Sequence, residues 1–89
     1  MNDEQLREQL EHLNTELQDA ESLDPGRREL LQGLAGNIQE LLARSESEPD
    51  HYRTLGERLK EGVSELEASH PKITLLMRRA IDSLAYLGI

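Results

Sequence analysis

The chain has 89 residues, which suffices for one small domain and leaves no room for a second packed core. It contains no Cys, Trp or Phe, so disulfide frameworks, thiolate zinc sites and cysteine nucleophiles are excluded. A formal net charge of −8 argues against binding to DNA or RNA, because their phosphates repel an acidic protein. No apolar run approaches the roughly 20 residues of a membrane span, and the acidic N-terminus lacks a secretory pattern, so we expect a cytoplasmic protein.

The first predicted helix covers residues 3–20. Its apolar residues recur in steps of four and three and fill an arc of only about 80° around the helix. They are Leu6, Leu10, Leu13, Leu17 and Ala20. This narrow seam is typical of a coiled coil, and either Asn2 or Asp3 can cap the start of the helix.

The second predicted helix covers residues 25–44. Asp24 is a good N-cap, and Pro25 suits the first helical position because its missing N–H costs no hydrogen bond there. The apolar residues of this helix span about 140°. They are Leu30, Leu31, Leu34, Ala35, Ile38, Leu41 and Leu42.

The third predicted helix covers residues 49–68 and begins at Pro49, with Ser47 or Glu48 at its N-terminal end. Its apolar residues again form a narrow seam of about 80°. They are Tyr52, Leu55, Leu59, Val63 and Leu66.

The fourth predicted helix covers residues 71–87. Pro71 disfavours helical geometry at His70, so a sharp corner falls there, and we expect the His70 imidazole to cap the turn. Gly88 suits a C-terminal stop. The apolar arc covers about 180°, and Leu75 and Tyr86 lie outside even that arc. Its members are Ile73, Leu76, Met77, Ala80, Ile81, Leu84, Ala85 and Leu87.

Four amphipathic helices predict an all-α fold, either a small up-down bundle or two helical hairpins completed across a dimer. No strand pattern competes, because β-branched and aromatic residues are scarce. Charge alternates along the chain, with net values of −7 for residues 1–24, +1 for 25–44, −4 for 45–70 and +2 for 71–89. In an up-down bundle, each acidic helix would lie between two basic ones.

The broad apolar face of the fourth helix predicts self-association. A helix in a small bundle needs an apolar face of roughly 100°, and an exposed excess is unusual on a monomer. We therefore expect a homodimer that uses the fourth helix, with support from the second. The expected interface residues are Leu76, Met77, Ala80, Ile81, Leu84, Leu87, Leu31, Ile38 and Leu42. The alternative is that the fourth helix lies centrally within one subunit.

Four glycines fall inside the predicted helices, where each costs up to about 1 kcal/mol relative to Ala. They are Gly33, Gly36, Gly56 and Gly62. One interpretation is that they allow close approach of two helices, and the other is that they are tolerated on the surface. For Gly56 and Gly62 we favour the surface interpretation.

The sequence offers little for catalysis or metal binding. His51 and His70 each end a Glu-x-x-His pattern, but the two patterns lie at opposite ends of one predicted helix, roughly 28 Å apart. A metal site at these residues or at His12 is therefore not expected. No nucleophile elbow and no phosphate-binding loop is present, so we predict no enzymatic activity and no cofactor.

Several segments resemble a known family. They are Asp3-Glu4-Gln5-Leu6-Arg7, Ser22-Leu23-Asp24, Ile38-Gln39-Glu40-Leu41-Leu42, Ser69-His70-Pro71 and Leu87-Gly88-Ile89. Together they resemble the short acidic bacterial proteins catalogued as domain of unknown function 4404. The resemblance implies a small, all-helical, cytoplasmic bacterial protein, and it implies no activity, substrate or cofactor.

The sequence as a whole predicts a non-enzymatic helical protein that binds itself and acts as an adaptor or small regulator, with another protein as a further possible partner. The alternative is a binder of anionic lipid surfaces through the fourth helix, which carries Lys72, Arg78 and Arg79. We expect no nucleic-acid partner, and we weigh membrane binding below self-association because those basic side chains can pair with the acidic helices instead.

Overall fold

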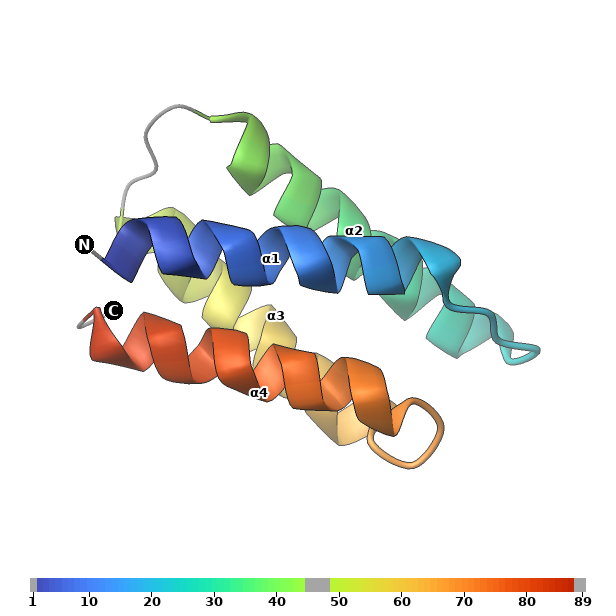
Figure 1. Cartoon of the computed structure of the whole chain (residues 1–89). Helices are drawn as coiled ribbons and strands as arrows, with labels where there is room; N and C mark the ends of the chain where they lie inside the picture. The colour runs from blue at the N-terminus through green and yellow to red at the C-terminus, as the bar shows by residue number, and fades with distance from the viewer. Residues whose placement is uncertain (1, 45–48, 88–89) are drawn as a thin grey trace.

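Four helices account for nearly all of the part of the chain that the structure describes, residues 2–44 and 49–87 of a computed structural model (Figure 1). They are α1 (Asn2–Asp19), α2 (Pro25–Ala43), α3 (Pro49–Leu66) and α4 (Pro71–Tyr86). These described ranges contain no strand, and every helix end lies within two residues of its predicted position. The all-α prediction is therefore confirmed.

The helices form a closed ring in which each one packs against two others (Figure 1). Helix α1 lies against α2 and α4, and α3 lies against the same two helices. Within the described residues, no Cα of α1 lies within 8 Å of α3, and none of α2 within 8 Å of α4. The chain thus closes an up-down bundle by itself, and Figure 1 shows both chain ends at the same end of that bundle.

The ring order confirms the expected arrangement of charge. The two acidic segments supply α1 and α3, which are diagonal to each other, while α2 and α4 separate them. In the part of the chain that the structure describes, two ion pairs cross between neighbouring parts of the bundle. Lys72 Nζ lies 2.9 Å from Glu16 Oε1, and Arg78 Nη2 lies 2.6 Å from Glu67 Oε1. The ring order therefore reduces repulsion within an acidic chain.

The core runs through all four helices and is built mainly from leucine. Its fully buried side chains include one or more residues from each helix. The largest of them are Leu6, Leu10, Leu13, Leu34, Ile38, Leu59, Leu66, Met77 and the hydroxyl-bearing Thr74. The Thr74 hydroxyl donates a 2.9 Å hydrogen bond to the Pro71 oxygen, so this buried polar group is satisfied.

Local sequence signals explain the helix ends. Asp24 caps α2 as predicted, since its Oδ1 accepts hydrogen bonds from the N–H groups of Gly26 at 2.8 Å and Arg27 at 3.3 Å. At the C-terminal end of α2, the Arg7 guanidinium donates to the oxygens of Leu42 and Arg44. This contact satisfies carbonyl groups that the helix itself leaves without partners. The expected caps of α1 and α3 and the stop at Gly88 fall on side chains or residues outside the described part.

The corner before α4 differs from its prediction. His70 occupies the N-cap position, but its side chain makes no capping hydrogen bond to α4. Instead, its Nε2 lies 3.0 Å from the Glu21 oxygen, and its Nδ1 lies 2.8 Å from Ser69 Oγ. The ring therefore connects the α3–α4 corner to the α1–α2 loop rather than capping α4.

The glycine prediction is wrong for Gly62. This residue is buried, and a Cβ placed there would lie 3.0 Å from Leu34 Cδ1 and 3.2 Å from Met77 Sδ. Gly62 thus allows close packing of α3 against side chains of two other helices. At Gly56 a Cβ would make only an ordinary 3.5 Å contact with Leu84, and Gly33 and Gly36 have open space around them.

Candidate functional site

The side chains expected to form a self-association interface lie in or against the core of their own chain. Six of them are buried: Leu76, Met77, Ala80, Leu84, Leu31 and Ile38. The other three, Ile81, Leu87 and Leu42, are partly buried and pack against that core. These nine side chains are therefore covered within one chain, although α4 is not central, because among the described helices it packs against α1 and α3 only.

The broad apolar face of α4 can pack beside the narrow seam of α1 because polar side chains on the flanks of α1 also contact α4 and its N-terminal end. Helix α1 keeps a narrow apolar seam because its flanks make polar contacts. Gln9 Oε1 accepts a 2.6 Å hydrogen bond from Ser83 on α4, and Glu16 pairs with Lys72. A narrow helix can therefore pack beside a broad one, because polar side chains complete the contact. The width of an apolar arc does not show which contacts the polar side chains on either flank of that helix make.

The three histidines are far from forming a metal site. His12 is exposed on α1, His51 is half-buried on α3, and His70 is engaged at the α3–α4 corner. In the described ranges, no group of three or more His, Asp or Glu side chains is placed to hold a metal ion. Glu67 of the second Glu-x-x-His pattern pairs with Arg78, and Glu48 of the first pattern lies outside the described residues.

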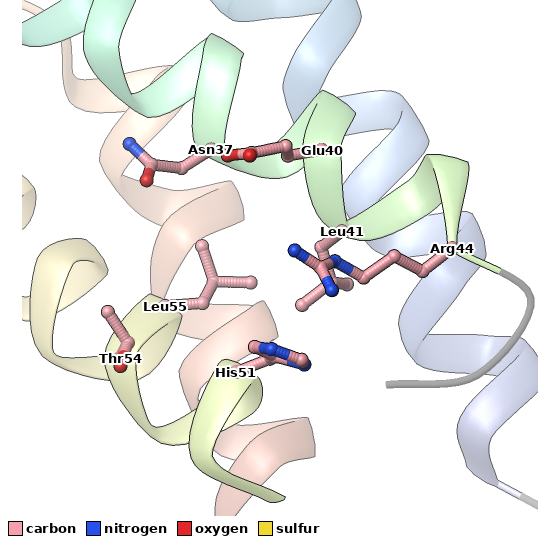
Figure 2. A pocket seen from close by; sticks show the side chains of 7 residues that line it. All are labelled: Asn37, Glu40, Leu41, Arg44, His51, Thr54 and Leu55. Carbon is pink, nitrogen blue, oxygen red and sulfur yellow. The ribbon is translucent and has the colours of Figure 1, made fainter. Parts of the chain in front are cut away.

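A shallow hollow lies between α2 and α3 (Figure 2). Its lining comes from one face of each helix: Asn37, Glu40, Leu41 and Arg44 on one side, and His51, Thr54 and Leu55 on the other. Figure 2 shows the side chains of Arg44 and His51 reaching into the space between α2 and α3. Thr54 makes no hydrogen bond within the described part of the chain.

The outward face of α4 carries the most distinctive exposed side chains. Leu75 is 49% exposed and Tyr86 is 77% exposed, and both belong to the small set of large exposed hydrophobic residues. Arg79 and Asp82 lie between them and are also exposed. We call these four residues, Leu75, Arg79, Asp82 and Tyr86, the outer stripe of α4. One signal for this stripe is present in the sequence, because Leu75 and Tyr86 fall outside the apolar arc.

The charges of the outer stripe differ from the other charges of α4. Lys72 and Arg78 each have an acidic partner within the chain. Among the described residues, Arg79 and Asp82 make no ion pair or hydrogen bond through their side chains. Beside them, toward α1, is an open hollow lined by Gln5, Gln9, Arg79, Asp82, Ser83 and Tyr86. The stripe is thus a charged and partly apolar surface that this chain leaves unused.

These features define a small all-α protein, a closed four-helix bundle with an apolar core and an acidic surface. The chain belongs to the family described as domain of unknown function DUF4404, whose model matches residues 6–89. The resemblance seen in the sequence is therefore confirmed. No curated protein and no solved structure matches the chain. None of the helices, within the described residues, is both long and apolar enough to cross a membrane.

Proposed function

We propose that this chain is a non-enzymatic helical interaction protein that binds a second copy of itself and acts as an adaptor or small regulator in the cytoplasm. The observation that carries the proposal is the outer stripe of α4. Of the three large hydrophobic side chains that are exposed in the described part of the chain, it holds two, Leu75 and Tyr86, on a bundle that buries its other α4 leucines and Met77. A protein–protein contact is the ordinary use of apolar side chains interleaved with charge on an exposed helix.

Among residues 2–44 and 49–87, we find no assembled reactive group, which supports a non-enzymatic role. The hollow between α2 and α3 is lined by side chains of mixed charge and polarity, and its Thr54 hydroxyl makes no hydrogen bond within the described part of the chain. Catalytic sites are usually enclosed and contain groups held in hydrogen-bonded pairs. The described surface offers shallow hollows of the kind found between the helices of any small bundle.

An anionic lipid surface is the second candidate, and the basic residues of α4 favour it. Two of those residues are committed elsewhere, because Lys72 pairs with Glu16 and Arg78 pairs with Glu67. The outer stripe itself combines one cation with one anion, so it has no net charge to attract phosphate headgroups. We therefore favour a protein partner.

Sedimentation equilibrium of the full chain tests the proposal from micromolar to millimolar concentration. The expected result is a concentration-dependent rise of mass from 10.1 kDa toward that of a dimer. A 10.1 kDa species throughout the range would overturn self-association. Flotation with vesicles of anionic and of neutral lipid, run in parallel, tests the second candidate, and cell fractionation tests the cytoplasmic location.

A further inference from the structure

We infer that the outer stripe of α4 is the self-association surface, and that it pairs antiparallel with the same stripe of a second copy about a two-fold axis. This inference rests on the proposed function and goes further by naming the surface, its register and its partner side chains. It also moves the interface from the inner face of α4, which the core occupies, to the opposite face.

The spacing of the outer stripe suits a helix–helix contact. Its residues are separated by four, three and four positions, so at 100° per residue they lie within an arc of about 60°. Steps of four and three are those of the seam between two paired helices. The stripe is about 16 Å long at 1.5 Å per residue, and it lies on the far side of the helix from Met77 and Ala80, which are both 0% exposed.

The order of residue types makes the stripe complementary to itself. Read along α4, it runs apolar, basic, acidic, apolar. In an antiparallel pair centred between Arg79 and Asp82, Leu75 faces Tyr86 of the second copy, and Arg79 faces Asp82 of the second copy. The two-fold axis repeats both contacts, which gives two apolar pairs and two ion pairs. A parallel, in-register pair would instead place Arg79 against Arg79 and Asp82 against Asp82, so charge complementarity selects the antiparallel form.

The surroundings of the stripe leave room for this contact. Arg79 and Asp82 have no ion-pair partner of their own in the described chain, so pairing across the interface breaks no existing ion pair. The hollow beside them is lined on the α1 side by Gln5 and Gln9. Both side chains are neutral, although the charge of α1 is mainly acidic. The α1 side of the hollow therefore repels neither Arg79 nor Asp82 of a second copy.

The size of the contact predicts a weak dimer. A stripe of about three helical turns buries well below the roughly 800 Å² per partner of a standard interface. The ion pairs lie at an exposed surface, where they contribute more to register than to affinity. We therefore expect a dissociation constant in the micromolar range or above, as suits a small regulator that exchanges partners.

Reversal of the two charges, one at a time and together, tests the register. The variants are Arg79→Glu, Asp82→Arg and the double variant, each examined as the full chain by sedimentation equilibrium. In an antiparallel pair, each single variant places like charges opposite each other, and we expect its dimer affinity to fall by about tenfold or more. The double variant restores both ion pairs with reversed sense, so its affinity should return to near the wild-type value.

Mixing the two single variants gives the sharper result. In a mixed dimer, every acidic stripe residue of the Arg79→Glu variant faces a basic stripe residue of the Asp82→Arg variant. The mixture should therefore associate more tightly than either variant alone, which fluorescence-detected sedimentation with one variant labelled would measure. Arg58 and Glu61 on α3 provide a matched control, because they have the same spacing and signs and are exposed. Arg58→Glu and Glu61→Arg should leave the affinity unchanged.

The outcomes separate this inference from the proposed function. A wild-type chain that stays monomeric overturns both. A wild-type dimer that Arg79→Glu leaves as tight as before overturns the stripe but leaves self-association standing. If both single variants lose dimer affinity and their mixture does not regain it, the antiparallel register is wrong. Flotation of the wild-type chain with anionic vesicles, lost in Arg79→Glu and strengthened in Asp82→Arg, would make a lipid surface the occupant and also overturn it.

Discussion

The Nε2 atom of His70 lies 3.0 Å from the main-chain oxygen of Glu21, and this contact joins two connections that are 49 residues apart in the chain. A carbonyl oxygen only accepts hydrogen bonds, so Nε2 carries the hydrogen. In the neutral ring, Nδ1 then accepts from the Ser69 hydroxyl, which lies 2.8 Å away. One imidazole thus connects the α1–α2 loop to the α3–α4 corner at a single end of the bundle.

Replacement of His70 should measure that connection. We expect His70→Ala to lower the free energy of unfolding by about 1 kcal/mol, because a net hydrogen bond contributes that much and the Glu21 oxygen becomes exposed to water rather than buried. Urea denaturation followed by circular dichroism gives the value. His12→Ala is the control, since His12 is exposed and should change stability by less than about 0.5 kcal/mol. Equal effects of the two variants would contradict the connecting role of His70.

Arg7 connects the start of the chain to the end of α2. Its Nη2 lies 2.6 Å from the Leu42 oxygen and 3.2 Å from the Arg44 oxygen, at the negative end of the helix dipole. We expect Arg7→Met to keep the apolar stem of the side chain and to lose about 1–2 kcal/mol of stability through the missing guanidinium. Chemical denaturation measures this loss. Arg58→Met removes an exposed arginine that makes no contact of this kind within the described chain, and a similar loss there would argue against the cap.

Two glycines should respond in opposite directions to the same substitution. Gly62→Leu forces a side chain toward Leu34 and Met77, which are 2% and 0% exposed, and overpacking of a core costs about 1–3 kcal/mol. Gly33→Leu adds a side chain in open space and gains about 0.5–1 kcal/mol of helix propensity. Thermal melts of both variants, compared with the wild type, check the difference. A stable Gly62→Leu variant would show that α3 does not approach its neighbours closely at this position.

The helices were predictable because each one is marked locally. Asp24 and Pro25, Pro49, and Pro71 place three of the four starts, and the leucine seams fix which face of each helix turns inward. The closed ring also follows in part, because alternating charge favours an order in which acidic helices are not adjacent. The structure adds that one chain closes this ring without a second copy.

The features that could not be predicted from the sequence depend on contacts between helices. Burial of Gly62 is set by the side chains of Leu34 and Met77, which come from α2 and α4. Whether the arc of α4 is in excess depends on how α1 completes its own contacts, through Gln9 and Glu16. Neither fact can be inferred from the residue pattern of a single helix. The sequence indicated part of the outer stripe, since Leu75 and Tyr86 lie outside the apolar arc of α4. The stripe became the candidate interface only because the structure buries the opposite face of α4.

Asn14 carries a buried side-chain oxygen without a hydrogen-bond partner in the described part of the chain, and its replacement should stabilise the protein. Its Oδ1 is buried and has no hydrogen-bond partner among the described residues, on the flank of α1 that also carries Arg7. An unpaired buried group of this kind costs about 1–3 kcal/mol. We expect Asn14→Leu to raise the free energy of unfolding by about 1–2 kcal/mol, part of it from helix propensity.

The same substitution at Asn37 separates the two contributions to this gain. The Asn37 side-chain amide donates to the Gly33 oxygen, so Asn37→Leu gains the helix propensity without relieving an unpaired group. Asn14→Leu should therefore exceed Asn37→Leu by about 1 kcal/mol in urea denaturation. Equal gains would mean that the Asn14 oxygen finds a partner in solution, and a loss at Asn14 would mean that α1 and α2 pack too closely there to accept a leucine.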